Sequence, residues 1–242
     1  MTWPLPTHLA THVIGEKGGD NWYYVWLIGW FEKALFELKQ NPLVVQFHNY
    51  PIGWNLAYSE ITPATILTAL PVSLISNPVL AYNFVSLLSF VLSGLIVYWW
   101  VNSLTKNPAA GLVSGTLFAF APYRLAHVYG HLPLLGTQYL ALHYAGLFSL
   151  LQQRSLNWKY ALITGIGLGL ASLSSMYYLY LSLIISTMII LGYILIAERQ
   201  APRRRVFWQN LLASSIIALP LCSLPFIHIS GSACRVTRTI VC

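Results

Sequence analysis

One stretch decides the fold: VLAYNFVSLLSFVLSGLIVYWWV, residues 79–101. It carries no charged side chain and ends in a Tyr-Trp-Trp group of the kind that gathers at membrane–water interfaces. About 20 mostly apolar residues in a helix span the hydrocarbon core of a bilayer. Residues 79–101 therefore predict a transmembrane helix.

Five more apolar stretches follow, separated by short polar connections. The six predicted spans cover residues 79–101, 109–121, 134–151, 160–173, 176–197 and 206–229. We therefore expect an all-α fold, a polytopic transmembrane helix bundle over residues 79–229. A long segment, residues 1–78, precedes this bundle, and an irregular tail is expected at residues 230–242.

The composition agrees with this fold. Hydrophobic residues make up 57% of the chain and charged residues 8%, whereas soluble domains carry about 25% charged residues. The net charge of +7 comes mostly from short basic clusters between apolar runs, and such clusters orient membrane proteins. We therefore expect no nucleic-acid partner, and the arginine run 203–205 suits anionic lipid headgroups. Three cysteines lack metal-ligand spacing and are interpreted as incidental: Cys222, Cys234 and Cys242.

The basic residues also predict an orientation. They occupy every second connection: Lys106, Arg154 with Lys159, and Arg199 with the run 203–205. By the positive-inside rule these connections face the cytoplasm. The connections at 122–133 and 172–175, and by parity residues 1–78, are then predicted to be non-cytoplasmic.

The N-terminal segment is predicted to contain interfacial helices. Residues 21–38 mix tryptophans and other apolar residues with charged ones, as in an amphipathic helix lying in the plane of the interface. Thr62 and Pro63 suit the cap and first residue of a short apolar helix that ends near residue 74. That helix is too short for a confident span, so we expect it to lie along the membrane or dip into it.

Both ends of the sequence look cut. Residues 2–14 have the character of the tail of a preceding helix, and the apolar pattern stops abruptly after residue 229. We therefore expect a fragment of a longer protein or a broken reading frame.

Two acidic residues stand out among the six in the chain. Asp20 follows two glycines and precedes a predicted helix, so it is either a helix N-cap or a general base or metal-binding carboxylate at the membrane surface. Glu60 has no basic neighbour in sequence. It either starts a helix in favourable contact with the helix dipole or pairs with a distant group or a ligand.

The 122–133 connection forms a second polar cluster. Arg124 could clamp a phosphate with two parallel hydrogen bonds. His127 and His131 are four residues apart and would share one helix face, but metal binding needs a third ligand. The alternative is an interfacial belt of Tyr, Arg and His side chains. His48 is a weaker candidate of the same kind.

The order of these elements resembles the GT-C superfamily of polytopic glycosyltransferases, which use polyprenyl-phosphate-linked sugars. The resemblance covers roughly residues 7–150. Four motifs carry it: Gly-Gly-Asp20, Tyr-Pro-x-Gly at 50–53, Ala-Pro-Tyr-Arg-Leu-Ala-His at 121–127 and Gly-His-Leu at 130–132.

The resemblance implies a hexosyl- or pentosyltransferase in the bacterial inner (plasma) membrane, part of the cell envelope. Asp20 matches the family's catalytic aspartate and would take a proton from the acceptor hydroxyl. Arg124, assisted by His127 or His131, would stabilise the leaving lipid phosphate. Glu60 would hold a divalent metal, Mg²⁺ or Mn²⁺, or orient the acceptor. Partners would be membrane lipid and the polyprenyl-phosphate-sugar donor.

The chain also departs from the family. It lacks an acidic couplet at Asp20, it lacks a first span, and superfamily members are about twice this long. The alternatives are therefore a non-catalytic membrane protein, such as a lipid or polysaccharide transporter or a scaffold, or an inactive fragment. A transporter should carry polar or ionisable residues near the middle of its spans. A membrane-anchored soluble enzyme needs a polar domain or a phosphate-binding glycine loop, and the sequence shows neither.

Overall fold

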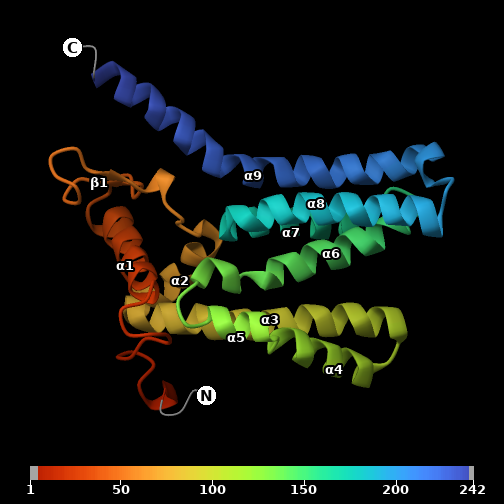
Figure 1. The fold of residues 1–242 in the computed structure, drawn as a ribbon, viewed down its shortest axis with the longest axis horizontal. Coiled ribbons are helices and arrows are strands. Elements are labelled where there is room, and N and C mark those ends of the chain that lie inside the picture. Colours follow the sequence, from red (N-terminus) through yellow and green to blue (C-terminus); the bar gives the residue numbers. More distant parts are fainter. Residues whose placement is uncertain (1–4, 240–242) are drawn as a thin grey trace. The chain divides into compact units, whose positions relative to one another are not determined.

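The computed structural model describes residues 5–239, with side chains described for residues 6–224, and this part of the chain is mostly helical (Figure 1). The all-α class is confirmed except for one two-stranded hairpin. The described residues divide into two compact units. The first comprises residues 5–90, 121–135 and 225–239, and the second comprises residues 91–120 and 136–224.

The first unit contains the N-terminal segment and the 122–133 connection. Its elements are η1 (Leu5–Thr7), α1 (Asn21–Glu32), η2 (Lys33–Glu37), β1 (Val44–Val45), β2 (Trp54–Asn55), η3 (Leu56–Tyr58), α2 (Pro63–Ile75), the first part of α3 (Pro78–Thr105), α5 (Pro122–His127) and η4 (Leu132–Leu135). The two strands pair antiparallel, with Val44 opposite Asn55. The boundary expected after residue 78 coincides with the start of α3, but the unit continues to Phe90 and includes residues from far along the chain.

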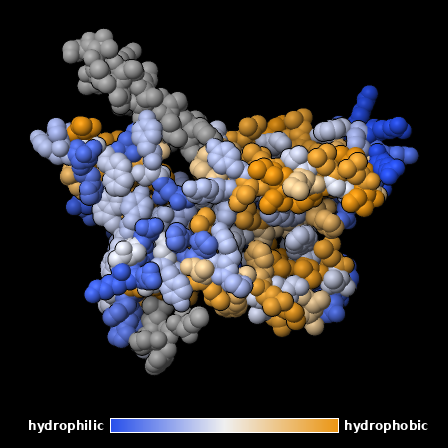
Figure 2. Space-filling model, viewed as in Figure 1, coloured by the Kyte–Doolittle hydropathy of each residue, from blue (hydrophilic) through white to orange (hydrophobic). Residues whose placement is uncertain are grey.

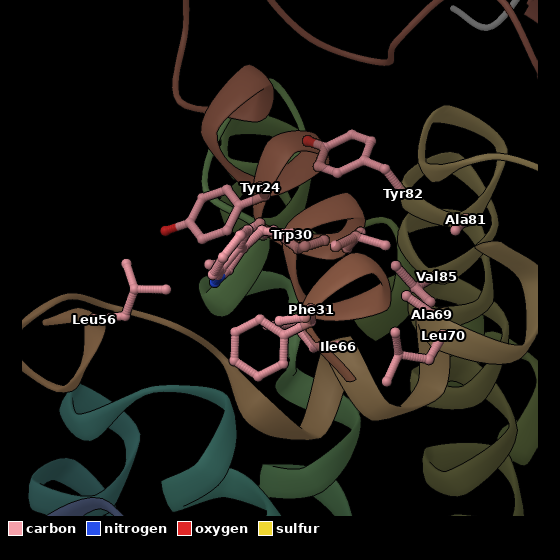
Figure 3. Close-up of a cluster of buried hydrophobic side chains, with 14 of the residues drawn as sticks. Tyr24, Trp30, Phe31, Leu56, Ile66, Ala69, Leu70, Ala81, Tyr82 and Val85 are labelled. Atoms are coloured by element: carbon pink, nitrogen blue, oxygen red, sulfur yellow. The ribbon is translucent and has the colours of Figure 1, made fainter. Parts of the chain in front are cut away.

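An apolar core holds the first unit together (Figure 3). Leu27 and Ile28 of α1 are fully buried and share this core with Ile66 of α2 and Tyr82 of α3. The absence of a side chain at Gly29 allows close approach, since a Cβ there would lie 3.0 Å from a ring carbon of Pro78. Residues 21–32 therefore bury their apolar side within the protein. The sequence did not predict this burial, because it shows an apolar face but not what covers that face.

The second unit is a set of helices packed through small residues. Its elements are the rest of α3, α4 (Pro108–Ala119), α6 (Thr137–Leu151), α7 (Trp158–Ser174), α8 (Met176–Gly192) with η5 (Tyr193–Ala197), η6 (Ala201–Arg203) and the first part of α9 (Arg205–Thr239). A Cβ on Gly115 of α4 would lie 2.5 Å from the carbonyl oxygen of Gly94 on α3. Such close backbone contact is typical of helices that associate in membranes.

Three helices are long and apolar enough to cross a membrane: Pro78–Thr105, Met176–Ala197 and Arg205–Leu224. They match three of the six predicted spans. The other three predicted spans correspond to the helices α4, α6 and α7, which have 12, 15 and 17 residues. Each is shorter than the roughly 20 residues that cross a bilayer. At 1.5 Å per residue, the 15 residues of α6 reach about 22 Å. α2 is the short apolar helix expected after Thr62.

The tail differs from its prediction. Residues 230–239 continue α9 as a helix, and residues 240–242 lie outside the described residues. The prediction relied on the loss of apolar pattern after residue 229. That loss marks the end of a membrane span and does not by itself end a helix.

Candidate functional site

Asp20 stands at the N-terminus of α1 with its side chain exposed. It occupies the N-cap position, but its backbone is helical (φ −65°, ψ −13°) and its side chain makes no capping hydrogen bond. A capping aspartate instead has a non-helical backbone and accepts hydrogen bonds from first-turn N–H groups. The cap position is therefore as predicted, whereas the carboxylate is left for other contacts.

The loop before Asp20 packs against the connection that follows α5. The backbone N–H of Glu16 donates to the carbonyl oxygen of Tyr129 at 3.1 Å. Gly15 has a φ of +134°, and a Cβ there would lie 2.6 Å from the same oxygen. A Cβ on Gly130 would lie 3.6 Å from the backbone nitrogen of Asp20. The structure thus brings Asp20 and the 122–133 connection together.

The pKa of one tyrosine, Tyr24, responds to both Asp20 and Glu60. Burial raises the pKa of Tyr24, and the negative charges of Glu60 and Asp20 raise it further. Burial also raises the pKa of Tyr23; the Ser59 side chain opposes this effect and the charge of Glu60 reinforces it. Charge effects fall off with distance. Asp20 and Glu60, both exposed, thus each lie close enough to Tyr24 to affect its pKa.

Glu60 lies in the extended turn between η3 and α2. Pro63 is the first residue of α2 and Thr62 is its N-cap, both as predicted. Thr62 has a left-handed backbone (φ 39°), and its hydroxyl donates to that of Thr65 at 2.9 Å instead of capping the helix. The side chain of Thr62 therefore does not cap α2, although its position is the N-cap.

Arg124 is buried, with only 1% of its surface exposed. Its Nη1 donates to the carbonyl oxygen of Leu135 and its Nη2 to the hydroxyl of Ser89, both at 3.0 Å. The guanidinium also lies over the Phe90 ring, 4.5 Å from the centroid. Arg124 therefore joins α3, α5 and η4 from the inside. The sequence predicted a surface position for this residue, whereas its side chain is buried. A phosphate clamp would need the guanidinium at the surface.

The histidines remain nearer the surface. Nδ1 of His127 donates to the carbonyl oxygen of Tyr123 at 2.7 Å. The ring centroids of His127 and His131 are 5.3 Å apart, so the two side chains are neighbours, but α5 ends at His127 and they do not share a helix face. His131 is exposed. His48 is also exposed and belongs to a different group, in contact with tryptophans.

The acidic and histidine side chains do not complete a metal centre. Among the described residues, no group of three or more His, Cys, Asp or Glu side chains is placed to hold a metal ion. Asp20 and Glu60 are two carboxylates near one tyrosine, without a third such ligand beside them. Mg²⁺ demands near-octahedral coordination and Ca²⁺ takes six to eight oxygens, so no metal is assigned here.

A row of aromatic rings along α1 was missed as a possible site feature. Tyr23, Trp26 and Trp30 follow each other at helical spacing, with ring centroids 6.0 and 6.4 Å apart. Trp54 of β2 lies almost parallel to Trp26, at 6.1 Å and 10°. The spacing of the three α1 rings was readable from the sequence, since residues three and four apart share a helix face. The contribution of the hairpin was not.

Asn83 was also passed over. It lies near the start of α3 as a buried amide in an apolar stretch. Its side chain bonds the backbone of Ile14, Leu9 and His12. A polar side chain within a predicted span is the signal that could have found it.

All six residues singled out from the sequence fall within the first unit: Asp20, His48, Glu60, Arg124, His127 and His131. The unit assembles Asp20, Glu60 and the histidine-bearing connection from segments more than a hundred residues apart. It does not bring the Arg124 guanidinium to the surface beside them.

Comparison with known proteins gives one match. No curated protein and no solved structure matches the chain. A family model described as a domain of unknown function, DUF6311, matches residues 19–234. This match begins immediately before Asp20 and covers most of the chain, so the protein belongs to the DUF6311 family.

Proposed function

We propose that this chain is a multi-pass integral membrane protein and a glycosyltransferase. It moves a hexose or pentose from a polyprenyl-phosphate-linked donor to an acceptor on the non-cytoplasmic face of the bacterial inner membrane. The exposed Asp20 carboxylate carries the proposal, since it is not used as a helix cap and acts, together with Glu60, on the same buried tyrosine.

The membrane location is supported by the surface of α8. Only 11% of the apolar stretch formed by α8 and η5, Met176–Ala197, is buried within the protein, and Ile184, Met188 and Ile196 are each more than half exposed. Figure 2 draws the apolar residues of the second unit as broad orange areas on the visible face. Burying one such side chain is worth about 1.5–3 kcal/mol relative to leaving it in water, so a lipid environment accounts for this surface.

The proposed chemistry is a direct displacement. The acceptor hydroxyl oxygen attacks the anomeric carbon, and the carbon–oxygen bond to the lipid phosphate breaks. The phosphate leaves with the bonding electrons, and Asp20 takes the acceptor proton. General-base catalysis of this kind contributes roughly 10²–10⁴-fold. Glu60 orients the acceptor.

The departing phosphate needs positive charge or hydrogen-bond donors. His131 is the exposed basic side chain on the connection packed beside Asp20. Arg124 is better suited to a positioning role, because its guanidinium is engaged by Leu135 and Ser89 inside the unit. In this proposal His131 contacts the phosphate, and Arg124 holds the surrounding segments in position.

A non-catalytic transporter is the alternative. It would need ionisable groups along a path through the spans. His143 in α6 is such a group, buried in the second unit. Both ring nitrogens are occupied, Nδ1 by the carbonyl oxygen of Thr164 at 2.9 Å and Nε2 by the hydroxyl of Ser186 at 2.7 Å. These bonds tie α6 to α7 and α8, which favours a packing role.

The test uses the full chain in nanodiscs with polyprenyl-phosphate-linked glucose, mannose and arabinose as donors, and with neutral oligosaccharides added as acceptors. Release of free polyprenyl phosphate in the presence of the wild-type chain, from at least one donor, is expected. A folded chain that releases none from any donor contradicts the proposal. Sided labelling of Gly18→Cys with an impermeant maleimide tests the orientation, and labelling only from the cytoplasmic side contradicts it.

A further inference from the structure

We propose that Trp26 and Trp54 form a stacking platform for a neutral oligosaccharide, which is the acceptor of the proposed transfer. This inference rests on the proposed function and names the class of its second substrate. The platform lies wholly within the first unit.

Its geometry is that of a flat aromatic wall. The rings of Trp26 and Trp54 are 6.1 Å apart and within 10° of parallel. His48 stands edge-on to both, 5.2 Å from Trp26 and 5.8 Å from Trp54. Trp30 closes the inner end, buried, with its Nε1 donating to the carbonyl oxygen of Pro42 at 2.6 Å. Because these contacts already fix the rings, ligand binding costs little side-chain conformational entropy.

The front of the wall remains open. Trp26 and Trp54 are each partly exposed. Within the part of the chain that the structure describes, the indole N–H groups of these two residues make no hydrogen bond, and neither N–H group is buried. The partly exposed indoles thus combine aromatic surface with N–H donors that make no hydrogen bond within the described residues.

This combination matches the chemistry of a sugar ring. A pyranose has one face made largely of C–H groups, and the negative face of an aromatic ring attracts such weakly positive hydrogens. Its hydroxyl oxygens can accept from the indole N–H groups at the edge of the stack. Binding sites for small ligands commonly combine aromatic walls with a few polar groups that fix orientation.

The neighbouring charges argue against a bilayer as the occupant. Tyr23 lies in ring contact with both Trp26 and Trp54, and its pKa is raised by burial and by the carboxylate of Glu60. Asp20 lies at the start of the same helix and is exposed. Exposed carboxylates beside the wall are costly in hydrocarbon, whereas they hydrogen-bond readily to sugar hydroxyls.

The platform is also at a useful distance from Asp20. Trp26 is six residues further along α1, which corresponds to about 9 Å along the helix axis. That separation accommodates roughly one to two sugar units between the stacked ring and the proposed base. The platform would therefore hold the glycan chain and leave its terminal hydroxyl at Asp20.

The experiment measures binding of cellotetraose, chitotetraose and mannotetraose to the full chain in phosphatidylcholine nanodiscs. Saturation-transfer NMR and tryptophan fluorescence are the readouts, with no donor present. At least one tetrasaccharide is expected to bind, with its C–H face most saturated. Trp54→Ala and Trp26→Ala should each weaken binding about tenfold, and Trp54→Phe much less. Trp22→Ala is the matched control, on the same helix and 52% exposed.

Three outcomes would overturn the platform. These are no binding of any tetrasaccharide to the folded wild-type chain, equal binding by the alanine variants, and quenching of Trp54 by brominated lipid without any effect of sugar. Tetrasaccharide binding without donor turnover would refute the proposed transferase activity but not the platform. Turnover that is unchanged in both tryptophan variants would refute the platform but not the transferase activity.

Discussion

The side-chain oxygen of Asn83 accepts a 2.9 Å hydrogen bond from the backbone N–H of Ile14. The amide nitrogen of the same side chain donates to the carbonyl oxygens of Leu9 and His12, at 2.8 and 2.7 Å. One side chain of an apolar helix thereby fixes the segment that leads toward Asp20. The position of the candidate base depends on a residue that does not touch it.

Replacing Asn83 should loosen that segment. Asn83→Leu removes three hydrogen bonds and should lower the free energy of unfolding by about 3 kcal/mol, at ~1 kcal/mol for each bond. Hydrogen exchange over residues 9–14 should become fast. Asn102→Ala, on the same helix, is the control and should leave exchange there unchanged. Unaltered protection in Asn83→Leu would refute this anchoring role.

Arg124 should behave as a structural residue. Arg124→Ala leaves the partners of a buried guanidinium without donors, and should cost about 3 kcal/mol. Arg154→Ala, whose side chain is 71% exposed in an ion pair with Glu198, should cost less than about 1 kcal/mol. Thermal unfolding in detergent compares the two. Equal and small effects would place the Arg124 side chain outside the core.

Two helical glycines provide a matched test of packing between α6 and α7. A Cβ on Gly167 would lie 2.5 Å from the backbone nitrogen of His143, whereas one on Gly192 would meet nothing within 4 Å. Gly167→Ala should therefore destabilise the second unit. Gly192→Ala should be neutral or stabilising by about 1 kcal/mol, since alanine favours helix. Tolerance of both substitutions would show that the two helices are not in close contact.

The Glu198 cluster should respond to acid. Although desolvation acts to raise the pKa of Glu198, hydrogen bonds from Arg154 and Tyr193 and the charge of Arg204 outweigh it, so the pKa lies below its ordinary value of 4.5. A lowered folded pKa gives stability that is present above pH 4.5 and lost as pH falls through the folded value.

Hydrogen exchange over residues 198–204 measures this effect. Protection should be constant from pH 7 to about pH 4.5 after correction for intrinsic exchange, and should fall below it. In Glu198→Gln the acid-dependent step should be absent. A step that persists in this variant would assign the titration to another group.

Helical class and three of the six spans could be predicted from the sequence because long apolar runs report directly on membrane-spanning helices. The shorter helices could not be judged in this way. α6 and α7 are tied together by Gly167 and His143, and such contacts depend on pairing between segments that hydropathy does not describe.

The sequence could predict which residues belong to the candidate site, but not how their side chains are arranged. Asp20 and Glu60 stood out by the scarcity of acids, and the structure brings them toward one tyrosine. The direction of a side chain was not predictable, as the burial of Arg124 shows. The aromatic wall required the hairpin that brings Trp54 to Trp26, and a two-residue strand leaves little trace in sequence.

The central claim is tested most directly by the rate of polyprenyl phosphate release from the accepted donor, measured for the wild type, Asp20→Asn and Glu37→Gln. Glu37 is an exposed acid just after the same helix and serves as the control. The account predicts that Asp20→Asn falls by about 10²–10⁴-fold while remaining folded, and that Glu37→Gln keeps the wild-type rate. A folded Asp20→Asn variant with an undiminished rate would contradict it.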